Sequence, residues 1–189
     1  MLGRYKHRFT FITTLACKID VNPDYITLSS LVPAVLACYF LYVNEVAFAG
    51  VMILLNGFLD ALDGAVARAH NRVTPRGELL DALVDKYGEC AILTFLLCAG
   101  IPPAAVCAAI VGVLMTTYVQ ARVGETLGRK KLFSGVGLER SERAILLASG
   151  CMLSTLFDSA LLYVTLFIAI FSNLTALLRF VKGWNVLKT

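Results

Sequence analysis

Residues 60–85, DALDGAVARAHNRVTPRGELLDALVD, decide the fold and the chemistry of this chain. Their four carboxylates form two pairs, Asp60 with Asp63 and Asp81 with Asp85. Spacings of three and four residues place each pair on one face of a helix. The polar connector between the pairs contains a proline, which predicts a tight turn between two helices. Such a hairpin would bring all four carboxylates together.

Clustered carboxylates must bind cations or be protonated, because like charges at short range cannot all stay ionised unaided. A divalent metal site is the economical explanation, and oxygen ligands favour Mg²⁺ or Mn²⁺ over Zn²⁺. Gly64 and Gly77 leave the helix surfaces bare, so that a backbone or a ligand phosphate can approach closely. The alternative interpretation is a pair of solvated helix ends that face water and hold no ion.

The composition is that of a membrane protein. Apolar residues make up 58% and charged residues 16% of the chain, and the mean hydropathy is +0.76, whereas soluble domains contain about 25% charged residues. We therefore predict a single all-α, polytopic membrane domain over residues 1–189. The six cysteines are scattered through apolar segments without a C-x-x-C pair. They are interpreted as small buried hydrophobes, not as a disulfide framework or a zinc site.

Six spanning helices are expected after an N-terminal surface helix. In residues 1–20 apolar side chains recur at helical spacing among basic ones, which predicts an amphipathic helix lying on the membrane. A signal peptide is disfavoured, because the apolar run FITTLAC is short and lacks a clear cleavage site. A six-helix bundle is expected over residues 26–182, with a tolerable kink at Pro33. The expected spans are residues 26–43, 46–69, 77–99, 104–127, 144–157 and 159–178.

The distribution of basic residues predicts the orientation in the cell membrane. The connections at residues 44–45, 100–103 and 158 contain no lysine or arginine. All 17 basic residues therefore fall at the other side of the bundle. By the positive-inside rule that side is cytoplasmic, and both termini and the aspartate motif lie there.

The carboxylates belong to a longer pattern, D-x-x-D-G-x-x-A-R, eight residues, then G-x-x-x-D-x-x-x-D. It closely resembles the signature of the CDP-alcohol phosphotransferases, membrane enzymes that make phospholipids. The resemblance implies that a small alcohol attacks a CDP-linked lipid, of diacyl or archaeal diether type, with release of CMP. Metal ions held by carboxylates can bridge the two phosphoryl groups and stabilise the developing charge. The residues that meet the pattern are Asp60, Asp63, Gly64, Ala67, Arg68, Gly77, Asp81 and Asp85.

The resemblance also implies roles for these residues. Asp60, Asp63 and Asp81 would be ligands of two Mg²⁺ or Mn²⁺ ions, and Asp85 would share a metal and act as general base. Glu78 and Glu89 are left out, because they lie off the Gly77–Asp81–Asp85 stripe or beyond its cavity end. For Arg68 the alternative role is that of a snorkelling residue at a helix end. The residues expected to contact the CDP-lipid are Pro23, Thr27, Gly64, Arg68, Thr74 and Gly77.

Basic residues beyond the motif suggest a phosphorylated acceptor. The stretches YVQARVGETLG and ERSER look like those of phosphatidylinositol-phosphate and archaetidylinositol-phosphate synthases, which implies inositol phosphate as the acceptor. Arg143 is expected to open the fifth span and Arg179 to end the sixth. Glycerol phosphate and serine remain alternative acceptors, and any single arginine could serve orientation or lipid contact instead. The candidate acceptor residues are Lys131, Arg140, Arg143 and Arg179, with Lys130 in the same basic cluster.

Three other classes of protein fit the sequence less well. An aspartate-rich prenyltransferase would need a different motif and a longer bundle. A cation transporter would place its acids near the bilayer midplane, and a non-catalytic scaffold would leave the complete motif unexplained. A homodimer is expected, and no nucleic acid polymer is expected as a partner.

Overall fold

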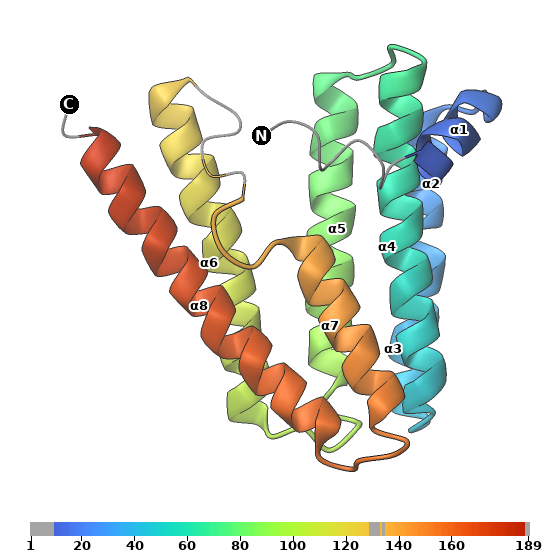
Figure 1. Cartoon of the computed structure of the whole chain (residues 1–189), viewed down its shortest axis with the longest axis vertical. Helices are drawn as coiled ribbons and strands as arrows, with labels where there is room; N and C mark the ends of the chain where they lie inside the picture. Colours follow the sequence, from blue (N-terminus) through green and yellow to red (C-terminus); the bar gives the residue numbers. More distant parts are fainter. Residues whose placement is uncertain (1–9, 129–132, 134, 188–189) are drawn as a thin grey trace.

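The computed structural model describes residues 10–128, 133 and 135–187, and the regular structure in this part of the chain is entirely helical (Figure 1). The predicted all-α class is therefore confirmed. The helices are α1 (Thr10–Lys18), α2 (Pro23–Ser29), α3 (Leu31–Tyr42), α4 (Val46–Ala69), α5 (Pro75–Phe95), α6 (Pro103–Leu127), α7 (Arg140–Leu153) and α8 (Ala160–Leu187).

The predicted helical hairpin is formed by α4 and α5. After α4 the chain turns at Asn71, which adopts a left-handed φ of 54°. Thr74 then caps α5, because its hydroxyl accepts a hydrogen bond from the Gly77 amide at 3.0 Å. Pro75 occupies the first turn of α5, where its missing N–H costs nothing. The helix therefore begins two residues before the predicted start.

The first predicted span is interrupted one turn before its proline. Pro33 lies inside α3, and the break falls at Ser30 between α2 and α3. A proline cannot bond the carbonyl four residues earlier and its ring crowds that carbonyl, which here belongs to Ser29. At the break, the Ser30 hydroxyl donates a hydrogen bond to the Thr27 carbonyl at 2.7 Å.

The last helices differ from the prediction at their ends. α7 begins at Arg140 and not at Ala144. Glu139 and Glu142 form a capping box at its start, so the charged residues 140–143 make up the first turn of the helix. α8 continues to Leu187, so that Arg179 lies inside the helix and not at its end. Both arginines that were expected at helix termini therefore project from helical turns.

Helices α6 and α8 lie side by side, whereas α7 begins beside the middle of α5 (Figure 1). The α6–α8 contact depends on Gly112, where an added Cβ would lie 2.8 Å from the Asn173 backbone nitrogen. Gly112 ends a run of mostly small residues at 104–112, and small residues permit such close helix packing.

In the part of the chain that the structure describes, four segments are long and apolar enough to cross a bilayer: Pro23–Tyr42, Val46–Ala69, Pro103–Leu127 and Ala160–Leu187. The chain is thus a multi-pass membrane protein, and these segments correspond to four of the six expected spans. α7 has only 14 residues, and α5 carries the charged half of the motif. Exposed apolar side chains on α3, such as Val32, Val35 and Tyr39, suit contact with lipid tails.

The described part of the predicted N-terminal helix is α1, and residues 1–9 lie outside the described residues. α1 does not stand alone. Ala16 is fully buried against α4, in a cluster with Leu62 and Val66. Its position on the membrane surface remains a prediction.

Replacing Gly112 with leucine should separate α6 from α8, because the new side chain would collide with the α8 backbone. Overpacking of this kind costs about 1–3 kcal/mol. Thermal unfolding in detergent should report a lower midpoint for Gly112→Leu. The matched control is Gly57→Ala, whose Cβ would meet only Ala144 Cβ at 3.9 Å. Equal midpoints for both variants would contradict the packing argument.

Candidate active site

Three carboxylates converge between α4 and α5. Asp60, Asp63 and Asp81 each offer one oxygen, and these oxygens lie within 4.8 Å of one another. Asp63 is only 4% exposed. Asp81 Oδ1 is buried and has no hydrogen-bond partner among the described residues. The convergence predicted from the residue spacing is therefore present for three of the four carboxylates.

This cluster fits a divalent cation. Three carboxylate oxygens at short range are electrostatically unfavourable without a compensating charge, and a buried oxygen without a partner is costly. Mg²⁺ and Mn²⁺ prefer oxygen ligands of this kind. Asp60, Asp63 and Asp81 would hold the ion, which would supply positive charge beside a bound diphosphate.

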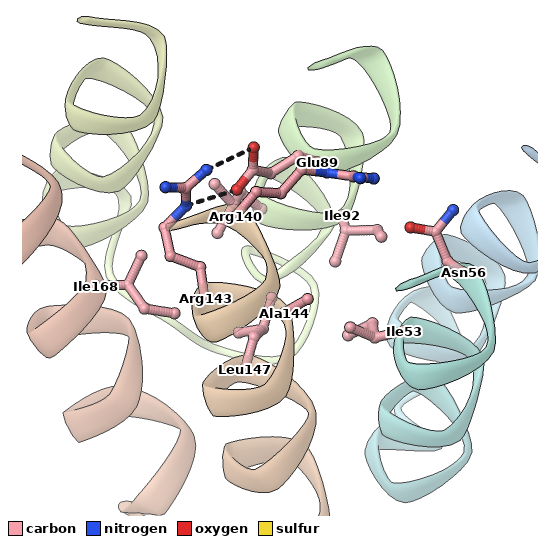
Figure 2. A pocket seen from close by; sticks show the side chains of 10 residues that line it. Ile53, Asn56, Glu89, Ile92, Arg140, Arg143, Ala144, Leu147 and Ile168 are labelled. Atoms are coloured by element: carbon pink, nitrogen blue, oxygen red, sulfur yellow. Dashed lines mark hydrogen bonds and ion pairs between the residues drawn. The ribbon is translucent and has the colours of Figure 1, made fainter. Parts of the chain in front are cut away.

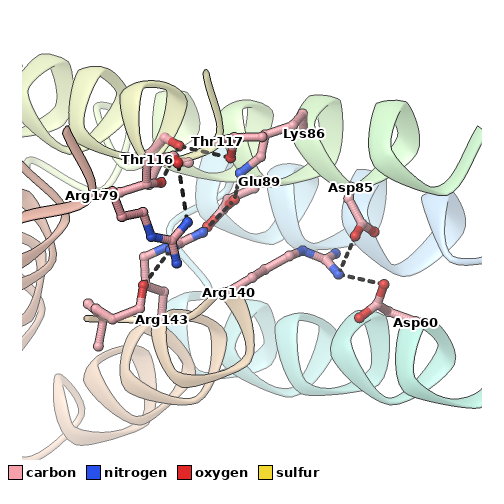
Figure 3. Close-up of polar contacts among 11 residues, drawn as sticks. Asp60, Asp85, Lys86, Glu89, Thr116, Thr117, Arg140, Arg143 and Arg179 are labelled. Carbon is pink, nitrogen blue, oxygen red and sulfur yellow. Dashed lines mark hydrogen bonds and ion pairs between the residues drawn. The ribbon is translucent and has the colours of Figure 1, made fainter. Parts of the chain in front are cut away.

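Asp85 lies one helical turn beyond the cluster and is paired with an arginine from α7. Arg140 Nη1 is 2.7 Å from Asp85 Oδ2 and 2.6 Å from Asp60 Oδ1 (Figure 3). A single guanidinium nitrogen therefore bridges the two helices of the hairpin. Arg140 was assigned to the acceptor from the sequence, and the structure places it on the carboxylates.

Thr27 connects the start of the first span to the cluster. Its hydroxyl donates to Asp63 Oδ2 at 2.7 Å, and the Pro23 carbonyl lies 3.1 Å away. Thr27 is 5% exposed, and Pro23 beside it is also buried. In this conformation the Thr27 hydroxyl orients a carboxylate that belongs to the cluster.

Two glycines let neighbouring side chains lie close to the helix backbone of the hairpin. A Cβ on Gly64 would lie 3.1 Å from Arg68 Nη1, so the Arg68 guanidinium lies over the bare helix surface. A Cβ on Gly77 would lie 3.2 Å from Thr74 Oγ1 and 3.3 Å from Asp24 Oδ1. The absent side chains therefore leave room that is taken by the Arg68 guanidinium at Gly64 and by the Thr74 hydroxyl and the Asp24 carboxylate at Gly77.

An open cleft of about 410 Å³ lies beside Thr74. Of its lining residues the sequence predicts only Thr74, because the connector that carries Arg72 and Arg76 is predicted only as a turn. The lining residues are Asn22, Asp24, Arg72, Thr74 and Arg76.

Arg143 and Arg179, both proposed from the sequence, are buried, at 5% and 8% exposure. Arg143 donates to both Glu89 oxygens, at 2.7 and 3.1 Å (Figure 2). Arg179 donates to Gln120 Oε1 at 2.7 Å and to backbone carbonyls of α6 and the α6–α7 connection. Lys131 lies outside the described residues.

Glu89 was left out of the site on sequence grounds, and the structure differs. Together with Arg140 and Arg143 it lines a small cavity of about 30 Å³ whose remaining walls are mostly apolar (Figure 2). Its position, four residues after Asp85 and eight after Asp81, continues the same face of α5. That spacing was the available signal.

Comparison with known proteins places these features in a family. The pattern that defines the CDP-alcohol phosphatidyltransferases matches residues 20–171. An archaetidylinositol phosphate synthase of Aeropyrum pernix is 37% identical over 135 residues, covering 71% of this chain and 68% of that protein. The corresponding protein of Pyrococcus horikoshii is 32% identical over 167 residues, covering 88% and 85%.

The fold is also shared with a solved structure. A phosphatidylinositol phosphate synthase of Mycobacterium tuberculosis, with CDP-DAG bound, matches with a TM-score of 0.78 and 24% sequence identity. The match covers 92% of this chain and 93% of that chain. The family that the aspartate pattern predicted is confirmed: the chain belongs to the CDP-alcohol phosphatidyltransferases and is a membrane-embedded, metal-dependent transferase that uses a CDP-linked lipid.

Proposed function

We propose that the protein transfers a phosphatidyl-type group from its CDP-linked lipid to a hydroxyl of inositol phosphate, with release of CMP. The relatives from Aeropyrum pernix and Pyrococcus horikoshii are archaetidylinositol phosphate synthases, which supports this acceptor. The observation that carries the proposal is the burial of two arginines, Arg143 and Arg179, in the part of the bundle next to the carboxylates.

Buried cations require anionic partners, because desolvation of an unpaired charge costs several kcal/mol. Arg143 has Glu89 as a partner. Arg179 donates hydrogen bonds only to neutral acceptors among the described residues, while the charge of Glu139 acts on it favourably and that of Arg143 unfavourably. The dianionic phosphate of an acceptor would add negative charge in direct contact and accept bidentate hydrogen bonds. Lys131 is proposed as a further contact.

In this proposal the carboxylates divide the chemistry. Asp60, Asp63 and Asp81 hold metal, with two ions in all, and Asp85 shares one of them. Asp85 accepts the proton of the attacking hydroxyl, since it lies between the cluster and the arginines from α7. General bases act within about 3 Å of the proton that they remove.

The CDP-lipid is proposed to lie along the bare faces of the hairpin. Gly64 lets the diphosphate approach α4, and Arg68 supplies charge beside it. The cleft at Thr74 adds Arg72 and Arg76, whose charges suit the nucleotide. The residues proposed for this substrate are Pro23, Thr27, Gly64, Arg68, Thr74 and Gly77.

The membrane layout is proposed to comprise six spans, with α5 and α7 as the additional two, and an interfacial α1. The α3–α4, α5–α6 and α7–α8 connections lie at one end of the bundle, opposite the α4–α5 turn (Figure 1). Those three connections are the ones without lysine or arginine, which supports a cytoplasmic motif and cytoplasmic termini. A homodimer is proposed as the functional unit.

One assay tests the acceptor. Purified protein with CDP-lipid and Mg²⁺ is supplied in turn with inositol phosphate, glycerol phosphate, serine and inositol, and CMP release is measured with and without EDTA. We expect release with inositol phosphate that EDTA abolishes. A higher rate with glycerol phosphate, serine or inositol would overturn the acceptor. Isotope flux into liposomes without CMP release would instead indicate a cation transporter.

Replacing Asp85 with asparagine should lower kcat by about 100-fold or more, the usual scale of general-base catalysis. Affinity for the CDP-lipid should fall less than in Asp60→Asn, because Asp60 belongs to the converging cluster. Stopped assays of CMP release at several CDP-lipid concentrations give kcat and the KM for the CDP-lipid. A kcat near that of the wild type would rule out Asp85 as the base.

Replacing Arg179 with glutamine should raise the KM for inositol phosphate by about 10- to 100-fold, the loss expected for one charge-assisted contact. The KM for CDP-lipid should stay nearly unchanged. Lys182→Ala is the matched control, since it removes an exposed cation one turn further along α8. Equal effects of the two changes would point to general electrostatic attraction and against a phosphate contact at Arg179.

A further inference from the structure

We infer that Glu89 is a positioning residue for the acceptor: it holds the Arg143 guanidinium in the orientation that receives the phosphate. This inference rests on the proposed function. It concerns a carboxylate outside the aspartate motif, on a different turn of α5.

Glu89 and Arg143 form a bidentate pair with little access to solvent. Arg143 Nε donates to Glu89 Oε1 at 2.7 Å, and Arg143 Nη2 donates to Glu89 Oε2 at 3.1 Å. The side chains are 6% and 14% exposed for Arg143 and Glu89. Two parallel hydrogen bonds fix both the distance and the rotation of a guanidinium plane, which a single bond does not.

Lys86 holds the other side of the carboxylate. Its Nζ donates to Glu89 Oε2 at 2.8 Å from one turn earlier on α5. Glu89 is therefore fixed by a cation from its own helix and a cation from α7. The three groups together carry one net positive charge, so the cluster still attracts an anion.

Arg143 has N–H donors left for a ligand. A guanidinium has five N–H donors. Glu89 takes two of them, and Arg143 Nη1 donates a third to the Leu138 carbonyl at 3.0 Å. Two donors remain without a partner in the described part of the chain. Nη1 points away from Glu89 (Figure 2), so a free donor on that nitrogen is available to a phosphate oxygen.

The pairing also sets the register between α5 and α7. Arg140 and Arg143 are three residues apart on α7, and their partners Asp85 and Glu89 are four apart on α5. Each arginine of the first turn is thus anchored on one carboxylate of α5. In consequence Glu89 fixes where Arg143 lies relative to Asp85, the proposed base, and so where the acceptor hydroxyl would lie.

If the only role of the Glu89–Arg143 pair were to hold α5 and α7 together, an ion pair would not be required. Apolar residues of similar volume often replace a buried ion pair without loss of stability, and Leu147 and Ala148 show that α7 already contributes apolar side chains to the buried core. The distinguishing consequence of a positioning role is a selective change in the KM for the acceptor.

The test uses the full-length protein with Glu89→Gln, Arg143→Gln and the double variant. Glutamine keeps the shape of the side chain but offers one acceptor oxygen and no charge. We expect Glu89→Gln to raise the KM for inositol phosphate about tenfold or more, with the KM for CDP-lipid within about twofold of the wild type. In the Arg143→Gln background the same change should add less than about twofold, because Glu89 acts through Arg143.

Two further variants keep the result interpretable. Glu125→Gln is the matched control, since Glu125 also pairs with an arginine, Arg122, but on the exposed face of α6. If Glu89→Gln does not fold, Glu89→Asp carries the test: it keeps the charge and withdraws the carboxylate by one methylene, and the KM for inositol phosphate should still rise. Thermal unfolding of each variant identifies loss of fold.

An unchanged KM for inositol phosphate in a folded Glu89 variant would overturn the inference. So would an equal rise in the KM for CDP-lipid, or an additive effect in the double variant. A wild-type protein that releases CMP no faster with inositol phosphate than with inositol overturns the proposed function, and the role of Glu89 with it. A wild-type preference for the phosphate, with no selective effect at Glu89, overturns the inference alone.

Discussion

The mutual repulsion of carboxylates that converge from α4 and α5 is the constraint on which this structure depends. Asp60, Asp63 and Asp81 bring oxygens within 4.8 Å of one another, and Asp85 lies one turn away. In a bundle with few charges such a group requires cations. Arg140 supplies one from the first turn of α7, and a divalent ion would supply the rest. The start of α7 is therefore tied to the hairpin by charge.

The same principle organises the second half of the site. Glu89 continues the acidic face of α5 by one turn, and Arg143 continues the basic face of α7. The alternation of paired carboxylates and guanidinium groups ties the first turn of α7 to α5. Arg143, proposed to bind the acceptor, is thereby anchored one turn of α5 away from Asp85, the proposed base.

The sequence predicted the parts of the site that depend on local spacing. Helical periodicity of the aspartates and a proline-containing turn were enough to predict the α4–α5 hairpin and its converging oxygens. Contacts between distant segments were not predictable in this way. The partner of Glu89 lies 54 residues further along the chain, and the Thr27–Asp63 hydrogen bond joins residues 36 apart. The start of α7 was misplaced because its charged first turn was interpreted as a loop, although the Glu139–Glu142 capping box could have indicated it.

The most direct test of the metal centre is the anomalous scattering of crystals of this protein grown with Mn²⁺. The account predicts anomalous density bounded by the carboxylates of Asp60, Asp63 and Asp81, and its loss in Asp81→Asn crystals grown under the same conditions. Crystals of active protein that bind Mn²⁺ elsewhere, with no density among these three carboxylates, would contradict it.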